Sequence, residues 1–199
     1  MIFTSKSRNN TSKPVENRKP YIMRAFRPTS TIINPPYTKM LNPIRPSDGD
    51  RMKWGEPTWT LFHCMPEKIT QENFIKNKDS IIRLIVTICN NLPCPSCSSH
   101  AKQYMNKVNF IAIKSTDDLK KMLFLFHNSV NERKGYAQYS YDNLDEKYDN
   151  LDFNQVLNNF MFHFQKKIYA PNLIAQQMYR QKQVLIVKQW FQDNIGLFQ

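Results

Sequence analysis

The chain has 199 residues and carries 28 Lys and Arg against 16 Asp and Glu, which gives a formal net charge of +12. This length allows one domain of ordinary size with extensions. No apolar run approaches the roughly 20 residues that a membrane-spanning helix needs, and the first residues lack the apolar core of a secretory signal, so we expect an intracellular protein without a transmembrane segment. The four glycines form neither a dinucleotide-binding fingerprint nor a phosphate-binding loop, which excludes both kinds of nucleotide site.

The positive charge is concentrated at the N-terminus. Residues 1–53 hold eleven Lys and Arg against three Asp and Glu, and seven of the twelve prolines. This composition predicts a disordered basic arm, with ordered structure beginning near Trp54. Such an arm attracts anionic partners in a salt-sensitive way, or it simply stays solvated.

From Trp54 onward the apolar residues recur at helical spacing. A short helix is expected from about Pro57, ending or bending at Pro66. Further helices are expected over about 72–90, 94–107, 116–134, 153–164 and 176–191. The pattern predicts an all-α fold, a four-helix bundle with additional helices. We expect the bundle over residues 54–141 and a C-terminal helical extension of unknown role over 142–199.

Two cysteines, Cys94 and Cys97, form a Cys-x-x-Cys motif at the expected start of a helix. Unpaired amides and the helix dipole at that position lower the pKa of a thiol, which suits thiol–disulfide exchange. A zinc site is the alternative, and it would have to collect single ligands from elsewhere in the chain. The candidates are His63, Cys64, Cys89, His100 and His127. Two inert structural thiols are the third possibility.

Two other segments carry polar and aromatic residues at one-turn spacing. Trp59 and His63 are four residues apart, as are His127 and Asn131, so each pair lies on one helical face. Stacking rings, imidazoles and carboxamides suit a flat heteroaromatic ligand with polar edges. The alternative is a core tryptophan with capping or exposed asparagines.

Together these segments resemble the Erv/ALR family of flavin-linked sulfhydryl oxidases. That family combines a W-x-x-L-H-like segment, P-C-x-x-C and H-N-x-V-N, here in the same order at residues 59–63, 93–97 and 127–131. The resemblance covers residues 54–140 and is strongest to the compact members that large DNA viruses encode.

The resemblance implies a helical bundle that binds FAD and oxidises protein thiols. Cys97 would face the flavin and Cys94 would exchange with a substrate dithiol, with oxygen taking the electrons as hydrogen peroxide. The residues implied in FAD binding are Gly55, Trp59, His63, His127, Asn128, Val130, Asn131 and Lys134.

The chain also departs from the family pattern. Met122 stands where a tryptophan is usual, and Tyr136 and Ala137 replace a Lys-Pro pair. The stretch after His63, which normally ends in Tyr-Pro, here ends in Met65-Pro66 and is expected to break the helix early. No second cysteine pair lies in the arm or the tail, so Cys64 and Cys89 are expected to pack in the core.

The resemblance further implies a homodimer, and a protein dithiol or a thioredoxin-like carrier as the partner that Cys94 meets. A viral location, in the host cytoplasm or the virion, follows from it as well. The competing functions are a zinc-stabilised helical binding module and an oxidase-like scaffold without flavin.

Overall fold

The computed structural model of the protein describes residues 53–166 and 174–198. The expectations for the basic arm lie outside these ranges, and so does Pro171, where the sequence predicts a break between the last two helices. The regular secondary structure of the described residues is helical apart from one isolated bridge between Ile69 and Phe198, which confirms the all-α class. The α-helices are α1 (Gly55–Lys68), α2 (Gln71–Asn90), α3 (Pro95–Met105), α4 (Thr116–Lys134), α5 (Leu144–Tyr148), α6 (Phe153–Phe164) and α7 (Ile174–Asn194). Short 3₁₀ turns lie at Phe110–Ala112, Tyr141–Asn143 and Ile195–Leu197.

Side-chain caps fix where several helices begin. Thr70, Cys94, Ser115 and Asp152 each accept a hydrogen bond from a backbone amide in the first turn of the following helix. At α4, Asp118 also accepts from the backbone amide of Ser115, which completes a capping box. These caps explain why the predicted range 116–134 for the fourth helix is confirmed.

The first helix differs from its expectation. Pro66 lies inside α1, which continues to Lys68. A proline removes only one hydrogen-bond donor from a helix, and Pro66 is itself buried, so packing around this turn offsets the loss. The expectation that the helix breaks early after His63 is therefore wrong.

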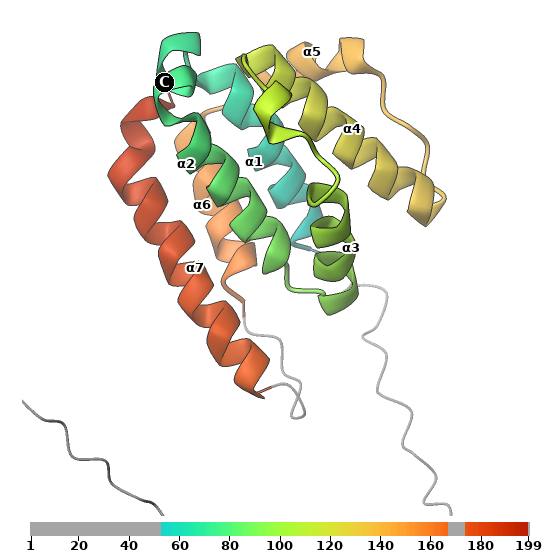
Figure 1. Ribbon diagram of the computed structural model, residues 1–199, viewed down its shortest axis with the longest axis vertical. Helices are drawn as coiled ribbons and strands as arrows, with labels where there is room; N and C mark the ends of the chain where they lie inside the picture. The colour runs from blue at the N-terminus through green and yellow to red at the C-terminus, as the bar shows by residue number, and fades with distance from the viewer. Residues whose placement is uncertain (1–52, 167–173, 199) are drawn as a thin grey trace, which may run out of the picture. The chain divides into compact units, whose positions relative to one another are not determined.

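The helices share one hydrophobic core. α1 packs mainly against α6 and α4, while α2 packs against α3 and α7, which runs beside it (Figure 1). Phe160, Phe164 and Phe191 of the C-terminal helices are as completely buried as Phe62 and Phe74 of the first two. Trp190 Nε1 also donates to Ser80 Oγ at 2.6 Å, which joins α7 to α2.

A buried cation attaches α5 to the bundle. Lys120 of α4 is 8% exposed and forms an ion pair with Glu67 of α1 at 2.7 Å. Its ammonium also pairs with Asp145 of α5. A buried lysine needs such partners, because an uncompensated charge in the interior is costly. The helical extension expected after residue 142 did not distinguish α5 as a separate helix, and the position of α5 depends on this long-range contact.

Among the described residues, no helix has both the length and the apolar character that crossing a membrane requires.

Gly135 ends α4 in the left-handed region, with φ of +69°. The amides of Gly135 and Tyr136 donate to the carbonyls of Glu132 and Asn131, at 3.0 and 2.9 Å, which closes the last turn. This conformation turns the chain back towards α4.

We expect Gly135→Ala to lower the free energy of unfolding by roughly 1–2 kcal/mol, because a Cβ atom is strained at this φ. The measurement is urea unfolding followed by circular dichroism. Gly196→Ala is the matched control, since an added Cβ meets no atom within 4 Å at either glycine and only Gly135 has a positive φ. Equal effects of the two substitutions would contradict the role of the left-handed conformation.

Candidate active site

A pocket opens beside the second cysteine, and we call it the cysteine pocket. It contains about 450 Å³ of space not filled by atoms, part of it open to solvent. Its walls come from α1, the α2–α3 connection, α3 and α4. The lining residues are Trp54, Gly55, Thr58, Trp59, Phe62, Leu92, Cys97, His100, Ala101, Phe126, Val130, Arg133 and Lys134.

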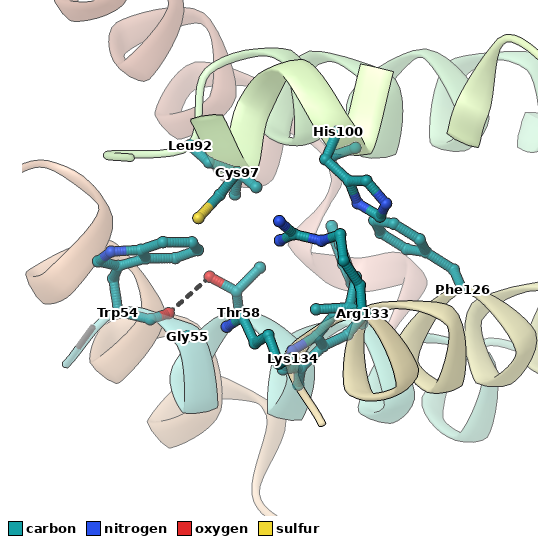
Figure 2. A pocket seen from close by; sticks show the side chains of 13 residues that line it. Trp54, Gly55, Thr58, Leu92, Cys97, His100, Phe126, Arg133 and Lys134 are labelled. Carbon is teal, nitrogen blue, oxygen red and sulfur yellow. Dashed lines mark hydrogen bonds between the residues drawn. The ribbon is translucent and has the colours of Figure 1, made fainter. Parts of the chain in front are cut away.

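Cys97, His100 and Arg133 contribute polar groups to this pocket, beside several apolar side chains. Figure 2 shows the Cys97 sulfur and the Arg133 guanidinium directed towards the same space, with the His100 ring next to Phe126. The Nδ1 atom of His100 is buried and has no hydrogen-bond partner. A buried nitrogen without a partner is costly, so this atom suits a polar group of a bound ligand.

Cys94 occupies the N-cap position of α3, and both cysteines are half-buried free thiols. The amide of Cys97 donates to Cys94 Sγ at 3.3 Å, and Ser96 Oγ lies 3.2 Å from the same sulfur. The Cys97 thiol, followed by Ser96, lowers the pKa of Cys94 to about 5 against the partial burial of the sulfur. The same interaction with Cys94 raises the pKa of Cys97. Cys94 is therefore the thiolate of the pair at neutral pH.

A second pocket, which we call the outer pocket, adjoins the first and holds about 900 Å³ of space, largely open to solvent. The two share Gly55, Trp59, Val130 and Lys134 in their walls. The other lining residues are Glu56, Thr60, His127, Asn131, Tyr136, Tyr139, Lys147 and Tyr148. Aromatic rings and two lysines thus face a space that continues from the cysteine pocket.

Stacked rings support the wall between the pockets. Trp59 lies parallel to His127, with centroids 4.0 Å apart and planes 7° apart. His63 stacks on Tyr148 of α5 with centroids 5.0 Å apart. The side chains of His63 and His127 are joined by a hydrogen bond of 2.9 Å between Nε2 and Nδ1. These contacts hold α1, α4 and α5 together at this level.

Both histidines of this pair are neutral at pH 7. Burial, followed by the neighbouring His127, lowers the pKa of His63 to about 3, and burial lowers that of His127 to about 4. His63 Nδ1 is buried without a partner. We assign the proton to His63 Nε2, because a buried lone pair without a donor costs less than a buried N–H without an acceptor. This tautomer makes His127 Nδ1 the acceptor and leaves its Nε2–H as a donor.

The structure places the expected FAD-binding residues in two groups. Gly55, Trp59, His127, Val130, Asn131 and Lys134 line one or both pockets. His63 and Asn128 are not among the residues lining these two pockets. Asn128 instead accepts from and donates to the backbone of Tyr139, at 2.9 and 3.0 Å. It thereby holds the segment after α4 in place.

Several pocket residues were missed by sequence reasoning. We expected the bundle to end at residue 141. Tyr139 lies just before this boundary, and Lys147 and Tyr148 lie after it, yet all three line the outer pocket. Lys147 and Tyr148 reach it because α5 packs against α1. Arg133 precedes Lys134 in the last turn of α4, where two adjacent cations were the available signal. His100 was expected to be either a zinc ligand or a partly buried, hydrogen-bonded histidine, and was not expected to line a pocket.

The remaining cysteines lie away from this site. Cys64 and Cys89 are both 0% exposed, which confirms that they pack in the core. Burial raises the pKa of Cys64 to about 11 and raises that of Cys89 as well. Within residues 53–166 and 174–198, no three His, Cys, Asp or Glu side chains converge as metal ligands would.

Comparisons with known proteins agree with this geometry. An FAD-linked sulfhydryl oxidase of African swine fever virus is 27% identical over 111 residues, 56% of this chain and 89% of its own length. A relative in Invertebrate iridescent virus 6 is 32% identical over 95 residues, 45% of this chain and 86% of its own length. The FAD-linked sulfhydryl oxidase ERV1 of Arabidopsis thaliana is 23% identical over 101 residues, about half of either chain.

No solved structure matches the chain at a significant level. The sequence model of the Erv1/Alr family matches residues 56–149, which span α1 to α5 and therefore include every wall of both pockets except Trp54 and Gly55. With two viral relatives aligned over most of their length, the chain belongs to the Erv1/Alr family.

Proposed function

We propose that this protein is an FAD-linked sulfhydryl oxidase that forms disulfide bonds in protein substrates. The observation that carries the proposal is the position of Cys97, which belongs to a Cys-x-x-Cys pair and lines a pocket with Trp59, His100 and Arg133. A redox-active pair beside a pocket for a flat ring is the arrangement that electron transfer from thiols to a flavin requires.

The residues present fit FAD. The cysteine pocket has an apolar wall for the flavin ring, and the unpartnered His100 Nδ1 lies there to meet a polar edge of it. Lys134 and Lys147 line the adjoining outer pocket, where cations suit the two phosphates. Tyr139, Tyr148 and His127 add aromatic and polar surface for the adenosine half. We assign to Gly55, Val130 and Asn131 the walls of the same binding site, with His63 and Asn128 acting through the residues that they position.

The pair divides the work between its two sulfurs. Cys94 is at the helix N-terminus and outside the walls of both pockets, while Cys97 lines the cysteine pocket. A substrate thiolate attacks Cys94 Sγ of the oxidised pair, which forms a mixed disulfide and releases Cys97 as a thiolate. A second substrate thiolate then attacks the substrate sulfur of the mixed disulfide, which closes the substrate disulfide and releases Cys94. Bound FAD supplies the acceptor for the two electrons of the dithiol, which pass with two protons to oxygen as hydrogen peroxide.

The electrostatics of Cys97 favour this order. The interaction with the Cys94 thiol is the largest cause that raises the pKa of Cys97, whereas Lys134 and Arg133 lower it. When Cys94 is bound in the mixed disulfide, its charge and hydrogen bond are lost, and the two cations remain. Cys97 is then stabilised as a thiolate while it faces the cysteine pocket.

The proposal includes four further predictions. The protein forms a homodimer, Cys94 meets either a protein substrate or a thioredoxin-like carrier, the basic arm contacts anionic partners, and the protein is located in the host cytoplasm or the virion.

We expect the purified protein to show a flavin absorption spectrum, with the chromophore released on unfolding. Cys97→Ser should keep the flavin and lower oxygen uptake with dithiothreitol by roughly 1,000-fold or more, because the covalent relay is lost. The double variant Cys64→Ala/Cys89→Ala is the matched control and should retain turnover. A folded protein that takes up no added FAD would contradict the proposal and favour a zinc module or a flavin-free scaffold, which metal analysis then separates.

We also expect reduced Cys94 to react with iodoacetamide with an inflection near pH 5, since its pKa is lowered to about 5 and the thiolate is the nucleophile. Cys97→Ala removes the largest cause and should move the inflection up towards 9, while Ser96→Ala should move it less. The measurement is the alkylation rate as a function of pH. Ser99→Ala is the control because Ser99 is exposed and has no hydrogen bond to Cys94 among those of the described residues. An unchanged inflection in Cys97→Ala would show that the helix N-terminus alone sets the pKa.

A further inference from the structure

A groove on the other side of Leu92 from the cysteine pocket is lined by the two chain neighbours of Cys94. It holds about 620 Å³ of space, part of it open to solvent, between the α2–α3 connection and the first turns of α7. Its lining residues are Asn90, Asn91, Leu92, Pro93, Pro95, Ser98, Gln176, Gln177, Tyr179 and Arg180. Cys94 is not itself among the lining residues, but its chain neighbours Pro93 and Pro95 are, so the groove runs along the backbone on both sides of Cys94.

Arg180 fixes the two walls of the groove relative to each other. Its Nε donates to the carbonyl of Asn91 at 3.0 Å, and its guanidinium also donates to the carbonyls of Phe164 and Lys166. It lies over the ring of Phe164 as well, 5.2 Å from the centroid. One side chain thus joins α7 to the ends of α2 and α6, and the groove is formed before anything binds.

The polar groups of the groove are available to a ligand. The side-chain amides of Asn90, Gln176 and Gln177 make no hydrogen bond to another described residue, and neither does the hydroxyl of Tyr179. Tyr179 is 61% exposed. Carboxamides both donate and accept, as a peptide backbone does, and prolines with a tyrosine offer apolar surface to a side chain.

We propose that this groove binds an extended segment of the substrate polypeptide next to its dithiol. The proposal rests on the proposed function, in which a substrate sulfur must reach Cys94 Sγ. The residues that flank the substrate cysteine then pass along Pro93, Pro95 and α7, at about 3.3 Å per extended residue. The unpaired amides of Asn90 and Gln176 are placed to bond the backbone of that segment, which gives affinity without a strict sequence requirement.

The test compares a polypeptide dithiol with a small one, using the full-length protein with FAD bound. The groove variant is Gln176→Ala/Tyr179→Ala. Its matched control is Gln189→Ala/Leu185→Ala, which removes the same amide and a large apolar side chain from exposed positions of α7 outside the groove. The substrates are reduced, unfolded ribonuclease A and dithiothreitol, and the readouts are kcat and KM from oxygen uptake.

We expect the groove variant to lose about tenfold in kcat/KM with reduced ribonuclease A, through KM, because contacts made by the polypeptide are lost. Its kinetics with dithiothreitol and its flavin spectrum should equal those of the parent, and the control variant should match the parent on both substrates. An equal loss on both substrates, no loss on ribonuclease A, or an equal loss in the control would overturn the groove proposal alone. A flavin-containing parent that oxidises neither substrate would instead overturn the proposed function together with it.

Discussion

The hydrogen bond between His63 and His127 joins α1 to α4 at the level where the two pockets meet. It needs an unprotonated nitrogen on the accepting ring, and burial provides this by lowering the pKa values of both histidines far below 6.5. Trp59 covers His127 on one side, and Tyr148 stacks on His63. The walls contributed by α1 and α4 to both pockets keep their spacing because of this join.

Local sequence signals predicted the helices well where capping decides their ends. The range of α4 was predicted from the helical spacing of its apolar residues, and the structure adds the capping residues Ser115, Asp118 and Gly135 at its two ends. Pro66 shows the limit of local reasoning, because packing around a buried turn outweighs one missing hydrogen bond. A helical extension was expected after residue 142, but the position of the short α5 could not be predicted, since it depends on the ion pair between Lys120 and Asp145, which are 25 residues apart.

The site divides in the same way. Three motifs on α1, α3 and α4 were expected to converge, and Trp59, Cys97 and Val130 do line one pocket. The motifs do not contain the residues after position 135 that line the outer pocket. The side-chain amide of Asn128 holds the backbone of Tyr139, and this contact directs the following residues to that pocket. Asn128, which the motif suggests as a ligand contact, lines neither pocket and instead has a positioning role that only the fold reveals.

The C-terminal helices are an integral part of the folding unit and not an appendage. Phe160 and Phe164 lie in the same core as Phe62 of α1, and Trp190 bonds Ser80 of α2. Elements that bury a common core open and close together, so the cysteine pair and the residues of α7 share one cooperative unit. A shortened chain without α6 and α7 would lose core as well as the groove wall, so the proposed substrate site and the fold of this chain depend on the same helices.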